Sequence, residues 1–229
     1  MNKKIAAVIV AAGSGTRMGA SINKVFLPLG KYTVIDYTVN TVLKSEKIDM
    51  AVLVTREEDI DEAEKHIKHM GKPIKVISGG KTRQESVFKG LREITGFDIA
   101  VIHDGARALI TTDIINCCIE DCIKYGAAAA GVLCKDTLKQ IDKDGFIQRT
   151  VDRSITYQIQ TPQVFYLKDI LLAHERAVSE NISVTDDCAL YEKYIGKVRI
   201  TQGSYSNIKL TTPEDMITAE GILRKRELL

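Results

Sequence analysis

A glycine-rich segment with basic residues follows the first apolar stretch of the chain. Residues 11–19 read AAGSGTRMG, and Lys24 follows a few positions later. Glycines such as Gly13 and Gly15 at the end of a strand allow backbone N–H groups to turn toward an anion, so the segment predicts a phosphate-binding loop. Arg17 and Lys24 would place positive charge where charge develops during attack on phosphorus. A tight turn with two solvated cations is the alternative interpretation.

Two common phosphate-loop patterns do not fit this segment. The dinucleotide-binding fingerprint requires a third glycine at position 18, where Met18 stands. The P-loop requires Gly-Lys-Ser/Thr at a fixed distance, and none follows. The sequence therefore predicts a glycine loop that carries its own cations.

Short apolar runs alternate with helix-like stretches through the first two-thirds of the chain. The runs occupy residues 5–10, 50–55, 74–77, 98–103, 128–133 and 197–201. Helical spacing of apolar residues is found between the runs, at residues 34–43, 60–69 and 87–94. This alternation predicts an α/β, Rossmann-like fold with a mostly parallel, right-handed sheet. In such sheets ligands bind beyond the C-terminal ends of the strands.

One segment departs from the alternation. Residues 136–153 read DTLKQIDKDGFIQRTVDR, in which polar and apolar residues alternate around Lys143-Asp144-Gly145. This pattern is typical of a β-hairpin, so we expect a single domain over residues 1–229 with an inserted arm at about 134–155. Apolar residues such as Phe146 would be exposed on an isolated arm. Pairing with a second copy in a two-fold homodimer would cover them.

Composition excludes several classes of protein. The chain has 229 residues, with 32 Lys and Arg against 30 Asp and Glu, a net charge of +2 and a pI of 8.2. These values fit an ordinary enzyme domain and disfavour a dedicated nucleic-acid-binding protein, which is usually more basic. No apolar run approaches the roughly 20 residues that span a bilayer, so we expect neither nucleic acid nor membrane as a partner.

The five cysteines and the N-terminus bear on location. An odd number of cysteines without CxxC spacing predicts reduced thiols and a cytoplasmic protein. Cys118 and Cys122 lie one helical turn apart, but no histidine or further cysteine is near them in sequence, so we predict no metal site. The basic start and apolar run of residues 1–12 also have the outline of a short secretory signal. A buried first strand that leads into the glycine loop is the favoured interpretation.

Other polar residues allow two interpretations each. His103 precedes Asp104 at the end of a predicted strand, where it could be a base, but a buried histidine that caps a loop is favoured. Asp186 and Asp187 could bind a metal, yet an N-cap of a helix is favoured. Arg153, judged by its hairpin context alone, is a solvated charge.

The chain resembles the 2-C-methyl-D-erythritol 4-phosphate cytidylyltransferase family of the non-mevalonate isoprenoid pathway, from Val8 to Glu220. The motifs that carry the resemblance are AAGSGTRMG at 11–19 with Lys24, GGKTRQESV at 79–87, HDGAR at 103–107, DTLK at 136–139, TVDR at 150–153, QTPQ at 160–163, TDD at 185–187 and NIKLT at 207–211. Each motif alone is weak evidence for the family, but the occurrence of all of them in this order along the chain is highly specific.

The resemblance implies transfer of CMP from CTP to 2-C-methyl-D-erythritol 4-phosphate, on a fold of the nucleotide-diphospho-sugar transferase type. It implies Mg2+ held mainly by the CTP phosphates, with no metal ligands from the protein, and a homodimer formed through the arm. The implied catalytic residues are Arg17, Lys24, Arg153 and Lys209. The implied nucleotide-binding residues are Ala11, Ala12, Gly13, Gly15, Gly80, Arg83, Ser86 and Asp104. The implied residues for the polyol phosphate are Asp104, Thr137, Arg153, Thr161 and Lys209, with Thr137 and Arg153 supplied by the partner subunit's arm.

One motif departs from the family pattern. The family usually has alanine and proline at the positions of Gly105 and Ala108. Asp104 and Arg107 are retained, so the departure concerns the stiffness of the loop and the choice of polyol phosphate. A ribitol-5-phosphate cytidylyltransferase is therefore an alternative, as is a non-catalytic nucleotide-binding module.

Overall fold

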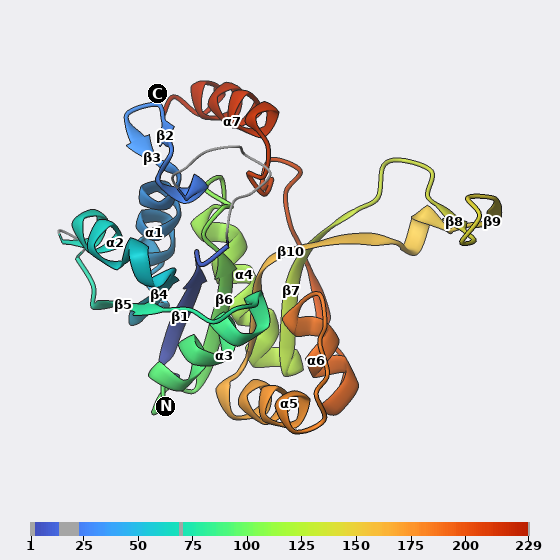
Figure 1. The fold of residues 1–229 in the computed structure, drawn as a ribbon, viewed down its shortest axis with the longest axis horizontal. Helices are drawn as coiled ribbons and strands as arrows, with labels where there is room; N and C mark the ends of the chain where they lie inside the picture. Colours follow the sequence, from blue (N-terminus) through green and yellow to red (C-terminus); the bar gives the residue numbers. More distant parts are fainter. Residues whose placement is uncertain (1–2, 14–22, 69–70, 229) are drawn as a thin grey trace.

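A seven-stranded sheet forms the centre of the computed structural model, which describes residues 3–13, 23–68 and 71–228 (Figure 1). Its strand order is β11-β7-β10-β6-β1-β4-β5. The strands are β1 (Ile5–Val10), β4 (Met50–Thr55), β5 (Ile74–Ser78), β6 (Ile99–Asp104), β7 (Ala127–Leu133), β10 (Tyr157–Tyr166) and β11 (Arg199–Gln202). The strands predicted from the apolar runs are confirmed, with boundaries shifted by at most two residues. The favoured interpretation of the first apolar run, a buried strand, is also confirmed.

Strand direction agrees with the predicted mostly parallel sheet, with one exception. β10 pairs antiparallel with both β6 and β7, whereas the other neighbours are parallel. β10 was not predicted from the sequence, because it follows the arm instead of a helix and contains the polar sequence QTPQ. Its reversed direction brings Thr161 level with Asp104 at the C-terminal end of β6.

Helices cover both faces of the sheet. α1 (Val34–Lys44), α2 (Ile60–Ile67) and α4 (Thr112–Tyr125) contribute to the core on one face, and α3 (Arg83–Glu93), α5 (Leu167–Ser179) and α6 (Asp187–Tyr194) contribute to the other. β1 supplies both cores by alternation, since Ile9 belongs to the first and Val8 to the second. Burial of each such side chain stabilises the fold by about 1.5–3 kcal/mol.

Side-chain caps fix where the helices begin. Thr82 is the N-cap of α3 and accepts a hydrogen bond from the Glu85 N–H, so the helix starts at Arg83 beside the sheet edge. Asp186 is the N-cap of α6, which confirms the capping interpretation of that aspartate. α7 (Pro213–Lys225) begins with a capping box and packs against the short strand β2 (Pro28–Leu29), which pairs with β3 (Tyr32–Thr33) (Figure 1).

The predicted hairpin is confirmed as an arm that projects away from the sheet (Figure 1). β8 (Lys139–Ile141) and β9 (Ile147–Thr150) pair antiparallel, and Gly145 adopts a positive φ of 88° in the turn between them. Phe146 and Ile147 near this turn are 71% and 63% exposed. The arm therefore offers an apolar surface that its own chain leaves uncovered, and the homodimer stays a prediction.

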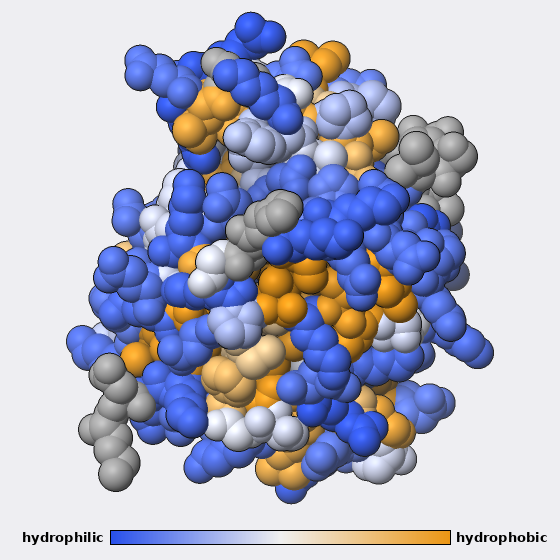
Figure 2. Space-filling model, turned by 90° about the vertical axis from the view of Figure 1, so that its left-hand side faces the viewer, coloured by the Kyte–Doolittle hydropathy of each residue, from blue (hydrophilic) through white to orange (hydrophobic). Residues whose placement is uncertain are grey.

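The opposite edge of the sheet is formed by β5. A shallow groove there is lined by apolar side chains of α2 and β5 and by Lys68, Lys72 and Lys75. Figure 2 views the molecule from this side and shows an apolar area framed by hydrophilic residues. No helix among the described residues is long and apolar enough to cross a membrane.

All five cysteines are free thiols. Cys118 and Cys122 are buried on α4, and burial raises the pKa of each thiol to about 12. The described part of the chain contains no group of three or more potential metal-ligating side chains. Both cysteines are therefore core residues of the first hydrophobic cluster.

Candidate active site

A cavity of about 340 Å³ lies where β1, β5 and β6 end. Its position agrees with the rule that ligands bind at the C-terminal edge of parallel strands. Three segments that are distant in sequence form its walls: the end of β1 with the start of η2 (Lys24–Phe26), the start of α3, and the end of β6 with the segment before α7. The lining residues are Val10, Ala11, Ala12, Gly13, Asn23, Lys24, Val25, Lys81, Thr82, Arg83, Ser86, Asp104, Ala106, Lys209 and Thr211.

Asp104 is the charged centre of this cavity. Its carboxylate receives Lys209 Nζ at 2.8 Å on Oδ2 and Arg83 Nε at 3.1 Å on Oδ1, and Arg107 Nε lies 3.7 Å from Oδ2. Burial alone would raise the pKa of Asp104, but the charges of Arg83, Lys209 and Arg107 outweigh burial and hold the pKa well below its usual range. Asp104 is therefore a permanent anion that fixes the positions of the surrounding cations.

Arg83 joins this centre to a second buried carboxylate. Its Nη1 donates to Asp187 Oδ2 at 2.7 Å while its Nε binds Asp104. Burial disfavours the charged guanidinium, but Asp187 and Asp104 outweigh burial and raise the pKa of Arg83 above its usual value. Arg83 is thus held charged and oriented at the cavity wall, where a phosphate or a ribose hydroxyl can meet it.

The wall predicted to frame the nucleoside is tightly packed. A Cβ on Gly79 would approach the Ala12 Cβ to 2.6 Å and the Ser86 Oγ to 2.7 Å, so only glycine lets these loops meet. The Gly80 N–H donates to Ser86 Oγ at 3.0 Å, and the Ala11 N–H donates to the Val54 carbonyl at 2.7 Å. These two N–H groups are already used within the protein. Ala11, Ala12 and Ser86 line the cavity, whereas Gly80 is not among its lining residues.

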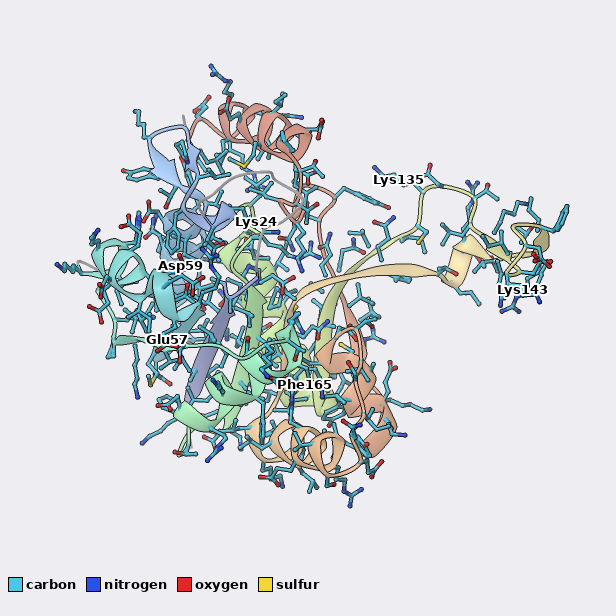
Figure 3. The ribbon with its side chains drawn as sticks, viewed as in Figure 1. Lys24, Glu57, Asp59, Lys135, Lys143 and Phe165 are labelled. Atoms are coloured by element: carbon cyan, nitrogen blue, oxygen red, sulfur yellow. The ribbon has the colours of Figure 1, made fainter. Side chains whose placement is uncertain are left out.

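Lys24 enters the cavity from the other side, supported by residues that the sequence analysis missed. Asn23 is buried beside it and donates from Nδ2 to the Ala11 carbonyl at 2.9 Å and to Asp59 Oδ2 at 2.8 Å. Asp59 in turn accepts two hydrogen bonds from Arg56, at 2.6 and 2.8 Å. Figure 3 shows Lys24 and Asp59 near the C-terminal end of β1. Arg17 and Gly15 lie outside the described residues, and Gly13 lines the cavity.

A smaller recess of about 150 Å³ adjoins the main cavity and shares Arg83, Asp104 and Lys209 with it. Thr161 lines this recess, and its hydroxyl accepts the Asp104 N–H at 3.0 Å. Asn207 is fully buried beneath and donates to the Gln160 side chain and the Thr161 carbonyl. Thr161 and Lys209, predicted for the polyol phosphate, are therefore brought together with Asp104.

Two predicted site residues lie elsewhere. Thr137 and Arg153 are exposed on the arm, and neither lines the cavity or the recess. Arg153 donates from Nη1 to the Lys135 carbonyl at 3.1 Å, beside the base of the arm. Figure 3 shows Lys135 and Lys143 on the arm, away from Lys24. Within one subunit, the arm leaves the cavity open.

His103 is confirmed as a buried structural residue. Its Nδ1 faces the Thr161 hydroxyl at 3.0 Å and its Nε2 faces the Arg107 carbonyl at 3.3 Å, so the protein engages both ring nitrogens. Burial lowers the pKa of His103 to about 4. The ring is neutral near pH 7 and does not reach the cavity as a base.

Gly105 and Ala108 are both closely packed. A Cβ on Gly105 would lie 3.1 Å from the Ala11 Cβ and 3.2 Å from both the Ile35 Cδ1 and the Val10 carbonyl. Ala108 is buried in a small cluster that includes Leu210 next to Lys209. The departure from the family pattern therefore concerns packing behind the cavity, because neither residue lines it.

The fold and the site together define an α/β protein with a cation-lined cavity at the C-terminal edge of its sheet. The sequence model of the 2-C-methyl-D-erythritol 4-phosphate cytidylyltransferase family matches residues 5–225. A curated protein of that name from Clostridium novyi is 43% identical over 223 residues, which are 96% of each chain. Another, from Caldanaerobacter subterraneus, is 42% identical over 225 residues, covering 96% of this chain and 99% of that one.

Solved structures agree with the sequence comparisons. The crystal structure of 4-diphosphocytidyl-2C-methyl-D-erythritol synthase from Anaerococcus prevotii matches with a TM-score of 0.89 and 34% identity over 97% of both chains. The chain belongs to the 2-C-methyl-D-erythritol 4-phosphate cytidylyltransferase family. The resemblance inferred from the motifs is confirmed.

Proposed function

We propose that this protein transfers CMP from CTP to 2-C-methyl-D-erythritol 4-phosphate and releases pyrophosphate, in a site that two subunits complete. Membership of the family supports the reaction. The assignment of residues rests on the cavity itself, which Lys24 lines together with Arg83 and Lys209, the two cations bound to the buried anion Asp104.

The main cavity receives MgCTP. Ala11, Ala12, Gly13, Gly80, Arg83 and Ser86, with Gly15, bind the nucleotide. Lys24 and Arg17 stabilise the charge that develops at the α-phosphate, which is where such catalysis derives most of its rate. Mg2+ would be held mainly by the triphosphate and water, in keeping with its reluctance to lose its hydration shell, and would supply neutralisation of phosphate charge. Asp104 is the one carboxylate among the described residues that line the cavity, and it is already bound by three cations, which fits this arrangement.

The adjoining recess receives the polyol phosphate. Thr161, Asp104 and Lys209 line it and would hold the polyol and its phosphate. A phosphate monoester with a second pKa near 6 is mostly ionised at neutral pH, so the nucleophile needs no protein base. This agrees with the absence of a histidine among the described residues that line the cavity and the recess.

Arg153 and Thr137 complete the recess from the partner subunit's arm. An arm that leaves its own cavity open and exposes apolar residues at its tip supports this arrangement. Arginine suits a phosphate because it can donate two parallel hydrogen bonds. The five free cysteines support a cytoplasmic location.

The test is pyrophosphate release from CTP and Mg2+ with methylerythritol, ribitol and glycerol phosphates in parallel. We expect methylerythritol phosphate to give the largest kcat/KM, and CTP to exceed UTP, because a wrong base leaves buried polar groups unpaired. A larger kcat/KM with ribitol phosphate would assign the protein to that substrate instead. Absence of pyrophosphate with every polyol phosphate would indicate a nucleotide-binding module without catalysis.

A further inference from the structure

A line of buried polar contacts leads from the cavity into the layer of helices behind it. It runs from Asp104 through Arg83 to Asp187 and ends at His174 on α5. Asp187 and His174 are 1% and 0% exposed. Neither lines the cavity or the recess, and the reaction described above does not use them.

His174 makes a single polar contact among the described residues. Its Nε2 lies 3.0 Å from Asp187 Oδ1, and its Nδ1 has no hydrogen-bond partner in the described part of the chain. Because the facing atom is a carboxylate oxygen, Nε2 carries the proton and donates it. The ring stacks on Phe88 of α3 with an interplanar angle of 6° and a centroid distance of 5.6 Å. Packing thus fixes the ring, and the ring directs one donor at Asp187.

Asp187 divides its two oxygens between histidine and arginine. Oδ1 accepts from His174 and Oδ2 accepts from Arg83 Nη1 at 2.7 Å. Its backbone N–H donates to the Gln163 side chain at 3.1 Å, which anchors the start of α6. Burial would raise the pKa of Asp187, but Arg83 and His174 outweigh burial and keep it below the usual value. The carboxylate is therefore charged, and its orientation depends on both partners.

We infer that His174 and Asp187 are positioning residues for the proposed reaction, because they set the plane of the Arg83 guanidinium at the cavity. The guanidinium is planar, and its Nε donates to Asp104 while its Nη1 donates to Asp187, so the group is held in one orientation. Asp104 then offers its other oxygen to Lys209. Preorganised groups of this kind stabilise a transition state without reorganising during the reaction. This inference rests on the proposed function, for which Arg83 contacts the nucleotide.

A pair of substitutions separates the donor from the ring. His174→Phe keeps a ring that can stack on Phe88 and removes the donor, whereas His174→Gln offers an amide N–H near the position of Nε2. We expect His174→Phe to lower kcat/KM for CTP about tenfold, the usual size of a lost hydrogen bond to a charged group. His174→Gln is expected to stay within about threefold of the unaltered protein. Ile170→Val, a mild core change on the same helix, controls for stability and should leave kcat/KM unchanged.

A double-mutant cycle tests the route of the effect. Lysine at position 83 cannot donate to both carboxylates through one planar group, so in an Arg83→Lys background His174→Phe should lower kcat/KM less than about twofold further. Calorimetry measures the CTP affinity of the same variants, so the comparison can be repeated in the absence of catalysis. Circular dichroism and thermal unfolding establish that each variant is folded.

Three outcomes would overturn the inference. The first is a kcat/KM of His174→Phe within twofold of the unaltered protein, and the second is a kcat/KM of His174→Gln as low as that of His174→Phe at equal stability. The third is that His174→Phe lowers kcat/KM in the Arg83→Lys background by the same factor as in the unaltered protein. Lack of pyrophosphate release by the unaltered protein would instead contradict the proposed function. In that case the calorimetric cycle still decides the role of His174.

Discussion

The cavity and the arm carry predicted site residues in opposite physical states. At the cavity, Lys209 and Arg83 bind Asp104 at 2.8 and 3.1 Å, and Asp104 itself is buried. On the arm, Arg153 and Thr137 are exposed, and Phe146 and Ile147 present apolar surface to solvent. The first region is formed within the chain, whereas the second, under the proposed function, gains its role only when a second chain meets it. If the proposed function is correct, the cavity depends on the fold of one chain and the arm residues depend on the assembly of two.

Among the substitutions considered, removal of the Lys209 side chain should have the largest effect on the catalytic rate. We expect Lys209→Ala to lower kcat about 100-fold or more, because a donor preorganised toward phosphate charge is lost. Steady-state pyrophosphate release measures this. Lys75→Ala is the matched control, since Lys75 pairs with Glu93 at the far edge of the sheet. An unchanged kcat with a raised KM would assign Lys209 to substrate binding alone.

The buried state of His103 should appear in the pH dependence of stability. As pH falls through 6.5 the unfolded chain takes up a proton on His103, whereas the folded protein does so only near its pKa of about 4. The free energy of unfolding should therefore fall by about 2–3 kcal/mol between pH 6.5 and 4, with the contribution fully present above pH 6.5.

Urea unfolding at several pH values, compared with His103→Gln, isolates this contribution. The variant cannot take up a proton at this position, so its stability should fall less over the same window. The pKa values of Asp104 and Asp187 are lowered, so these groups change the free energy of unfolding below about pH 4 and do not obscure the contribution of His103. Parallel losses in the two proteins would show that His103 is not held neutral.

The arm should respond through association and not through folding. Phe146→Ser is expected to weaken dimerisation about tenfold or more, as loss of a buried aromatic anchor does at an interface. At a concentration where the variant and the unaltered protein are both monomeric, the two should have the same melting temperature, since Phe146 is exposed in the single chain. Sedimentation velocity over a concentration series measures the association. Ile217→Ser on α7, with 73% of Ile217 exposed, is the matched control; equal effects of both substitutions would contradict a role for the arm.

Local patterns predicted most of the sheet. Continuous apolar runs such as IAAVIV in β1 and MAVLVT in β4 are characteristic of strands buried on both faces, and both were located correctly. β10 was missed because several of its residues are polar and line the recess, so its sequence lacks a continuous apolar run. The arm was predicted because alternation around a glycine turn is also a local pattern.

The support of the site could not be predicted in the same way. Asn23, Asp59, Asp187 and His174 are single polar residues far apart in sequence, and only the folded chain brings each to its partner. No spacing rule connects His174 to Asp187 or Asn23 to Asp59. The motif TDD marked Asp187, but as part of a helix start and not as the partner of Arg83.

A mixing experiment tests most directly whether two subunits complete one site. Inactive Lys209→Ala and inactive Arg153→Ala subunits are dissociated, combined in equal amounts and reassembled. Random pairing makes about half of the dimers mixed, and with arms exchanged each mixed dimer holds one site with neither defect. We expect recovery of about a quarter of the activity of the unaltered protein. If Arg153 serves its own subunit, every site keeps one defect, and mixing would recover no activity.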